Sequence, residues 1–143
     1  CCVIYVGCVC ADVGCGIGGS TAALADRFGA SVLGVDLSSN MISIAETRYQ
    51  QRPDLKFLVA DALHIPIEPN SLDLVYSRDT VLHFDVHEKK ILFSKAFQWL
   101  KPGGQVRKKR KTAVPIAVSS CCRYCCRLLI CCSCFSSIAV MHI

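Results

Sequence analysis

The chain has 143 residues, of which 52% are hydrophobic and 19% charged, a composition that excludes a disordered protein and allows one domain with a real core. The formal net charge of +5 is unevenly distributed, because all eleven acidic residues lie between Asp12 and Glu88, whereas the seven basic residues from Arg107 onward have no acidic counterpart. We therefore expect two different parts that meet near residue 106. No run approaches about eighteen consecutive apolar residues, which argues against a membrane span.

The twelve cysteines are also unevenly distributed. Five lie in residues 1–15 and seven in residues 121–134. A disulfide-stabilised domain would carry cysteines throughout, so we expect the body of the chain to belong to a reducing compartment, the cytoplasm. The chain has no initiator Met, and its start lacks the basic region of a signal peptide, so we interpret it as a fragment.

Five apolar segments are predicted to be strands and to alternate with three helices. The strands are expected at residues 9–13, 31–36, 55–60, 72–77 and from 105 onward. The helices are expected at residues 20–28, from a cap at Ser38 or Ser39 to Pro53, and from a capping box at Asp85 and Glu88 to the segment 101–104. This alternation is typical of a doubly wound α/β fold with a mainly parallel sheet, in which the first strand is central. After Val106 the pattern fails, because five consecutive basic residues stand where a buried strand would continue.

Apolar residues on one face of the second and third helices are expected to hold them against the sheet. In the second helix these are Met41, Ala45 and Tyr49. The third helix carries Leu92, Ala96 and Trp99, and the first carries Leu24 and Phe28 at i,i+4 spacing, with Gly29 as its stop.

The loop at residues 12–19, Asp-Val-Gly-Cys-Gly-Ile-Gly-Gly, connects the first strand to the first helix. Glycines permit a tight turn and the close approach of a nucleotide-like ligand, and the N–H groups that open the next helix offer donors to an anionic group. The spacing also fits the G-x-G-x-x-G pattern of nicotinamide-cofactor sites. Asp12 argues against that alternative, because an acid two residues before Gly14 would repel a pyrophosphate but could organise the loop around a cationic cofactor.

Acidic residues close the second and third strands. Right-handed crossovers place the carboxyl ends of parallel strands at one edge, which should bring together Gly14, Asp36, Asp61 and Arg78. Asp36 lies seventeen residues after Gly19, near the spacing at which an acid binds ribose hydroxyls, and Asp61 can accept from an exocyclic amine such as adenine N6. Each acid alone would more often be an ordinary surface cap, but together with the loop they favour an adenosine-containing cofactor.

Four segments resemble the ordered motifs of class I S-adenosylmethionine-dependent methyltransferases. Three of them are residues 12–19, 34–42 and 101–104. The fourth, Tyr76-Ser77-Arg78-Asp79-Thr80-Val81-Leu82-His83, is similar to the corresponding segment of the phosphoethanolamine N-methyltransferases, which methylate phosphoethanolamine stepwise to phosphocholine. The resemblance covers about residues 9–106. It implies a Rossmann-like domain there, S-adenosylmethionine as cofactor, and a phosphoethanolamine-type amine as the small-molecule substrate.

The resemblance also implies roles for the matching residues. The glycine loop would contact the methionine part of the cofactor, the acid after the second strand would hold the ribose, and the residues after the third strand would read the adenine edge. The residues so assigned to the cofactor are Asp12, Gly14, Gly16, Gly18, Asp36, Leu37, Asp61, Ala62 and Arg78.

Asp79 and His83 are the catalytic residues that the resemblance implies. Asp79 would face the substrate amine, and His83 would assist its deprotonation. A protonated amine has no lone pair with which to attack a sulfonium methyl, and a histidine near pH 7 is a suitable proton acceptor. Taken alone, His83 would more often be a core or capping histidine, and Arg78–Asp79 an ordinary surface ion pair. His64 and His87 are interpreted as structural, and no metal site is expected.

Both ends depart from the family. Family members carry a helix before the glycine loop with a Tyr that closes over the amine, and later strands with Tyr, Arg and Lys groups for the substrate phosphate. Residues 1–8 and 107–143 do not resemble these parts, so we expect a domain truncated at both ends and impaired in activity. We interpret the basic, Cys-rich tail as translation through a non-coding or frame-shifted segment.

Other interpretations of the tail and of the domain are kept open. Residues 107–111 fit a nuclear-localisation or nucleic-acid patch or a polybasic membrane anchor beside palmitoylated cysteines, and zinc could be recruited by Cys121, Cys122, Cys125 and Cys126. We expect no nucleic-acid partner and leave the oligomeric state open. For the domain, the alternatives are a methyltransferase for another small acceptor, such as a sterol or quinone precursor, and an inactive cofactor-binding fragment.

Overall fold

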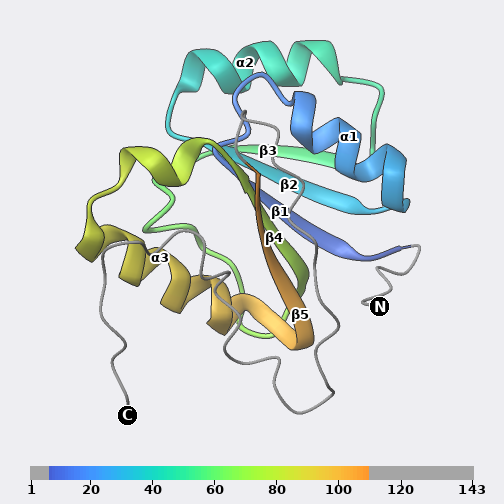
Figure 1. The fold of residues 1–143 in the computed structure, drawn as a ribbon. Coiled ribbons are helices and arrows are strands. Elements are labelled where there is room, and N and C mark those ends of the chain that lie inside the picture. The colour runs from blue at the N-terminus through green and yellow to red at the C-terminus, as the bar shows by residue number, and fades with distance from the viewer. Residues whose placement is uncertain (1–6, 110–143) are drawn as a thin grey trace. The chain divides into compact units, whose positions relative to one another are not determined.

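The computed structural model describes residues 7–109, all within one compact unit, and within them a parallel sheet is flanked by helices (Figure 1). The strands are β1 (Val9–Val13), β2 (Ser31–Asp36), β3 (Leu55–Val59), β4 (Leu72–Arg78) and β5 (Leu100–Lys109). The helices are α1 (Gly19–Phe28), α2 (Ser39–Arg48), α3 (Val86–Trp99) and the short 3₁₀-helix η1 (Thr80–His83). The expectations for residues 1–6 and for the tail beyond residue 109 fall outside the described residues.

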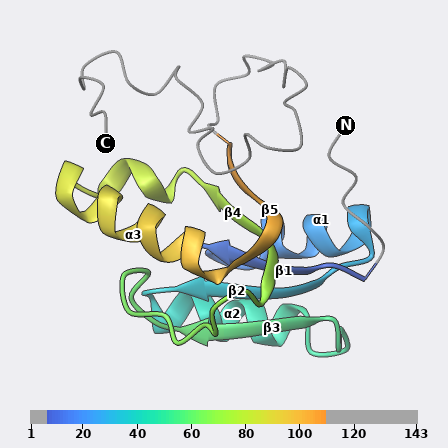
Figure 2. The same cartoon turned by 90° about the horizontal axis from the view of Figure 1, so that it is seen from below.

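The sheet has the strand order β3-β2-β1-β4-β5, and every pairing in it is parallel. Figure 2 shows β3, β2, β1 and β4 succeeding one another across the sheet. The chain moves outward from β1 to β3 and then returns to the other side of β1, which makes the β1/β4 junction a topological switch point. The predicted doubly wound α/β fold with β1 at its centre is confirmed.

The helices cover both faces of the sheet, with α1 and α2 on one face and α3 on the other (Figure 1). One apolar cluster packs Leu24 and Ala25 of α1 against Cys10, Val32 and Leu74 of the strands. The opposite cluster packs α3 against the other face through Leu92, Ala96 and Trp99, as predicted. Helices therefore cover both faces of the central strand β1, whose residues Cys10, Ala11 and Val13 are buried.

Helix ends form where the sequence signals them. Gly29 closes α1 in the left-handed region with a φ of 57°, and the Ser38 hydroxyl accepts the N–H of Met41 at the start of α2. At α3, the Asp85 carboxylate accepts the N–H of Glu88 while the Glu88 carboxylate accepts the N–H of Asp85, both at 2.8 Å. This reciprocal pair is the predicted capping box.

The buried face of α2 differs from the prediction at one position. Ala45 is buried and Tyr49 packs against the cluster that contains Leu24, as expected, but Met41 is 40% exposed and Ile42 is the buried residue, at 3%. The prediction that Met41 holds α2 to the sheet is therefore wrong. The i,i+3 pair of Ile42 and Ala45 faces the sheet, and Met41, the neighbour of Ile42, lies outside this buried face.

Strand β5 also differs from the prediction. It begins at Leu100, and the segment 101–104 forms an irregularity within it, since Leu72 pairs with Leu100 while Leu74 already pairs with Gln105. The strand then runs through the basic residues to Lys109, which pairs with Arg78, so the expectation that the strand pattern fails after Val106 is wrong. An outermost strand of the described sheet has solvent beside it, which lets Arg107 stay exposed. The domain boundary at residue 106 stays a prediction.

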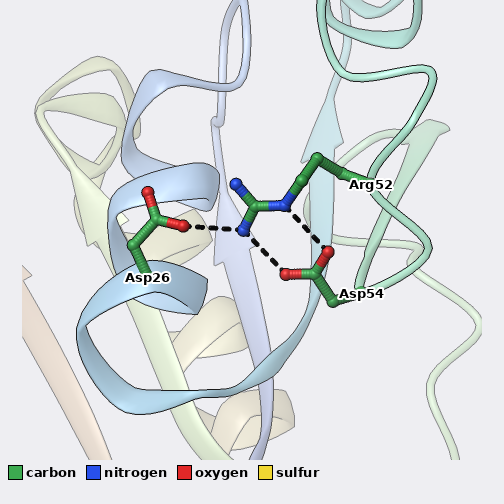
Figure 3. A network of polar contacts seen from close by, with 3 residues as sticks. All are labelled: Asp26, Arg52 and Asp54. Atoms are coloured by element: carbon green, nitrogen blue, oxygen red, sulfur yellow. Dashed lines mark hydrogen bonds and ion pairs between the residues drawn. The ribbon is translucent and has the colours of Figure 1, made fainter.

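A polar network joins α1 to the turn before β3, as Figure 3 shows. The Arg52 guanidinium donates to both carboxylate oxygens of Asp54, at 2.9 and 2.8 Å, and to Asp26 at 2.8 Å. The pKa of Asp54 is lowered chiefly by its hydrogen bonds from Arg52. The network lies at the amino end of β3, so it helps to hold the scaffold without taking part in the opposite edge of the sheet.

Candidate functional site

The carboxyl ends of the parallel strands share one edge of the sheet, and the predicted site residues lie on these strand ends and on the segments that follow them. Ligands of open α/β sheets bind outside this edge, at the switch point. Here the switch point lies between the glycine loop after β1 and the segment 78–83, which contains the end of β4 and η1. The candidate site is therefore built from residues 12–19 and 78–83, with residues 36–38 and 61–64 beside them.

The glycine loop is held by the end of β2. The N–H groups of Gly14 and Cys15 both donate to the carbonyl of Val35, at 2.7 and 3.0 Å, and the N–H of Gly16 donates to the Asp36 carboxylate at 2.8 Å. The predicted loop and the predicted ribose-binding acid are thus brought into direct contact. Gly14, Gly16 and Gly18 have φ values of 78°, 54° and 80°, which favour glycine at all three positions.

The three glycines differ in what surrounds them. A Cβ built on Gly14 would overlap the hydroxyl of Thr80, and one built on Gly18 would lie 2.9 Å from ring atoms of Phe57 and Tyr49. A Cβ on Gly16 would meet nothing within 4 Å. All three glycines are predicted to permit the close approach of a ligand, but of the three only Gly16 has open space where a side chain would begin.

Asp12 lies beneath the loop, with 0% of its surface exposed. Its Oδ2 accepts from the hydroxyls of Ser20 at 2.7 Å and Thr21 at 2.8 Å, at the start of α1. Its Oδ1 is buried and finds no partner among the described residues. Burial raises the pKa of Asp12, and the hydroxyls of Ser20 and Thr21 partly offset this. An unsatisfied carboxylate oxygen under the loop suits a ligand that brings positive charge or a donor.

The Asp36 carboxylate uses both oxygens within the protein. Besides the bond from Gly16, its Oδ1 accepts the N–H of Ser38 at 3.0 Å. Each carboxylate oxygen has a second lone pair, so Asp36 can still accept from ribose hydroxyls. Leu37, which follows it, is 75% exposed and offers an apolar surface beside the carboxylate.

Asp61 forms a pair that the sequence did not reveal. Its Oδ1 accepts the N–H of Leu63 and its Oδ2 lies 2.9 Å from Nδ1 of His64. These contacts, the Leu63 N–H first, lower the pKa of Asp61. The Asp-x-x-His spacing is the sequence signal that corresponds to this contact of His64, for which only a structural role is predicted. The main chain links this segment to the end of β2, since the N–H of Ala60 donates to the carbonyl of Asp36. Ala62 is partly buried against the core.

The segment 78–83 places Arg78, Asp79 and His83 at the same edge. Arg78 Nε lies 3.9 Å from Asp79 Oδ2, and Asp79 adopts the left-handed region with a φ of 64°, which is uncommon for a residue with a side chain. His83 ends η1 and is exposed. The N–H of Leu82 closes the turn on the carbonyl of Asp79. Burial raises the pKa of Asp12, and the charge of Arg78 offsets a small part of this rise.

The thiol of Cys15 is buried at this edge. Burial, followed by the charges of Asp12 and Asp36, raises the pKa of Cys15 to about 12, so this thiol stays protonated near neutral pH and is a poor nucleophile. Within residues 7–109 no group of three His, Cys, Asp or Glu side chains could hold a metal ion. In the same part of the chain no helix has the length and apolar character needed to cross a membrane.

Comparisons with known proteins agree with this arrangement. A family model described as a methyltransferase domain matches residues 10–104. Phosphoethanolamine N-methyltransferase 3 of Arabidopsis thaliana is 46% identical over 96 residues, which are 66% of this chain and 19% of that protein. Phosphoethanolamine N-methyltransferase 2 of Caenorhabditis elegans is 47% identical over 97 residues, which cover 66% of this chain and 22% of that protein. This chain therefore spans about a fifth of the length of these relatives.

A solved structure shows the same fold with ligands bound. It is Haemonchus contortus phosphoethanolamine N-methyltransferase 2 in complex with phosphomonomethylethanolamine and S-adenosylhomocysteine. Its TM-score to this structure is 0.67 at 40% sequence identity, and the match covers 71% of this chain and 24% of the solved one.

Proposed function

The chain belongs to the methyltransferase domain family, and from this we propose that it binds S-adenosylmethionine at the carboxyl edge of its sheet and directs methyl transfer to the amine of phosphoethanolamine or its mono- and dimethyl forms, towards phosphocholine. The observation that carries the proposal is the meeting of the glycine loop and the segment 78–83 at the switch point, where Thr80 lies against Gly14. The names of the relatives support the choice of amine.

The residues present fit the cofactor. Asp36 has free lone pairs for ribose hydroxyls, and the exposed Leu37 beside it can cover an adenine face. Asp61 and Ala62 follow the neighbouring strand, where a carboxylate can accept from an exocyclic amine. Gly16 leaves open space over the loop, and the buried Oδ1 of Asp12 beneath it lacks a partner among the described residues.

The chemistry supplied by bound S-adenosylmethionine is an electrophilic methyl group on a sulfonium. Around it, this chain has to position an amine and remove its proton. Asp79 provides a negative charge that attracts the cationic amine and orients it, with Arg78 beside the cofactor. His83 accepts the amine proton, which frees the lone pair for attack, and its exposure lets the proton pass on to solvent.

The compartment and the partners of the chain are also part of the proposal. Cys8, Cys10 and Cys15 are free thiols in the described part, which is compatible with the proposed reducing, cytoplasmic compartment. A small-molecule substrate is proposed, in keeping with what the solved relative binds. No nucleic-acid partner is proposed.

Calorimetry with S-adenosylhomocysteine, followed by a methyl-transfer assay on phosphoethanolamine, tests the proposal on the full chain. Binding together with transfer to phosphoethanolamine supports it. Binding without transfer to any acceptor supports an inactive cofactor-binding domain, and transfer to a sterol or quinone precursor alone overturns the proposed acceptor. The absence of S-adenosylhomocysteine binding overturns the proposal as a whole.

A further inference from the structure

Thr80 connects the two parts of the candidate site. It is the first residue of η1 and directly follows Asp79, whose φ of 64° lies in the left-handed region. Its Oγ1 lies 3.4 Å from the carbonyl oxygen of Gly14 and 3.3 Å from that of Arg78. A threonine hydroxyl has one proton, so the two carbonyls share a single donor. One side chain thus contacts both the glycine loop and the end of β4, although 66 residues separate Thr80 from Gly14.

The side chain of Thr80 is also packed directly against Gly14. The Thr80 hydroxyl occupies the volume where a Gly14 side chain would begin, and a Cβ at Gly14 would also lie 2.6 Å from the Thr80 methyl carbon. On the other side of Thr80, Val81 is buried at 3% in the cluster that contains Val13 and Val75. The start of η1 is therefore fixed both from the loop and from the core, and it cannot shift towards the loop without moving Gly14.

We propose that Thr80 is a positioning residue that couples the glycine loop to the segment 78–83, so that ligand binding at the loop and the ordering of Asp79 and His83 are one linked event. The link itself rests on contacts within the chain. The identities of the ligand and of the amine rest on the proposed function. The coupling free energy between the two segments is reciprocal. A change at Thr80 that weakens the effect of the loop on residues 78–83 therefore weakens the reverse effect equally.

Hydrogen exchange of the full chain, with S-adenosylhomocysteine as the probe, measures this coupling. In the wild-type chain we expect the amides of residues 79–83 to gain about five- to tenfold protection when the probe binds. In the Thr80→Ala variant we expect this gain to be lost, with the affinity for the probe reduced about three- to tenfold. The Thr80→Ser variant keeps the hydroxyl and should restore most of the gain, which a purely structural role of Thr80 does not predict.

The Thr47→Val variant is a matched control. The hydroxyl of Thr47 donates to the carbonyl of Ser43 at 2.9 Å on the exposed side of α2, remote in sequence from both coupled segments. We expect the protection gain at residues 79–83 to match that of the wild type in this variant. If Thr80→Ala keeps the full gain at saturating probe, the coupling is overturned.

A double-mutant cycle tests the link without any ligand. Gly14→Ala lowers stability for two reasons: Gly14 has a φ of 78°, and the new Cβ overlaps Thr80. In a Thr80→Gly background only the overlap is relieved. We expect the fall in Tm caused by Gly14→Ala to be about half as large in that background. Strictly additive Tm changes overturn the link, whereas a wild-type chain that fails to bind S-adenosylhomocysteine overturns the proposed function, so the two failures are distinguishable.

Discussion

The carboxylate of Asp36 accepts the backbone N–H of Gly16 at 2.8 Å, and so the acid that closes β2 also holds the loop that follows β1. Its second oxygen accepts the N–H of Ser38, where α2 begins. Any ligand that reaches Asp36 through its remaining lone pairs therefore meets a carboxylate already fixed in direction by two backbone donors. Because the Asp36 carboxylate is already ordered, ligand binding does not have to overcome the entropy cost of fixing it.

We predict that Asp36→Ala lowers the affinity for S-adenosylhomocysteine about 10- to 100-fold, because ribose hydroxyls lose a charged acceptor and the loop loses its tie to β2. Isothermal calorimetry measures the change. Asp54→Ala is the control, since Asp54 is also partly exposed and engaged by two donor atoms but lies at the opposite edge of the sheet. Unchanged affinity in the Asp36→Ala variant would contradict the proposed ribose site.

The glycines of the loop should separate a loss of affinity from a loss of stability. Gly16→Ala and Gly18→Ala both place a side chain at positive φ, which costs about 1–2 kcal/mol. Gly18→Ala must also displace the rings of Phe57 and Tyr49, so urea denaturation should show the larger loss of unfolding free energy for it. For each variant, the loss of S-adenosylhomocysteine affinity can be compared with the loss of unfolding free energy. We expect this ratio to be larger for Gly16→Ala than for Gly18→Ala. Equal stability losses would contradict the packing described at Gly18.

Asp12 should make the stability of the chain depend on pH. Burial raises its pKa in the folded state above the ordinary value of 3.8, so between these two values the folded state binds more protons than the unfolded state. The free energy of unfolding therefore falls as pH rises through this window, by up to about 1.4 kcal/mol per pH unit. The Asp12→Asn variant lacks this contribution. Its stability relative to the wild type should rise with pH above 3.8.

Urea denaturation of both chains at a series of pH values from about 4 to 7 measures this difference, because all other titrating groups are common to the two. Any altered hydrogen bonding from Ser20 and Thr21 to the amide adds an offset that does not vary with pH. A difference that stays constant across the series would contradict the raised pKa of Asp12.

The capping box of α3 should contribute measurably to stability. We predict that Asp85→Ala lowers the free energy of unfolding by about 1 kcal/mol, since the N–H of Glu88 loses its acceptor. Asp85→Ser keeps a capping oxygen and should lose only a small part of this in equilibrium unfolding. A loss of the same size in both variants would show that the carboxylate acts through its charge and not as a cap.

The fold was predictable because its signals are local. Apolar runs that end in glycine or an acid mark β1, β2 and β3, and the Asp85 to Glu88 spacing marks the start of α3. The site was predictable only as a set of segments at one edge. That Thr80 lies against Gly14 depends on a contact between residues 66 positions apart, which no local pattern carries.

The wrong expectations have physical causes of the same kind. Met41 and Ile42 are adjacent and both apolar, and each has a helical spacing to Ala45. Spacing alone therefore cannot decide which of them faces the sheet. A run of basic residues such as the one after Val106 is incompatible with a strand buried on all sides, but β5 is the outermost strand of the described sheet and one side of it needs no partner. In both cases the packing of distant elements decides what the local pattern leaves open.

The surroundings of the glycines have a practical consequence for protein engineering. The shape of the loop depends on Thr80 after β4 and on Phe57 and Tyr49 around β3, none of which lies in the motif itself. Transplanting residues 12–19 into another parallel-sheet scaffold would transfer the loop sequence without the side chains that pack against it. A successful graft has to include these three side chains, which makes the smallest portable unit of this site a four-strand block, β1 to β4.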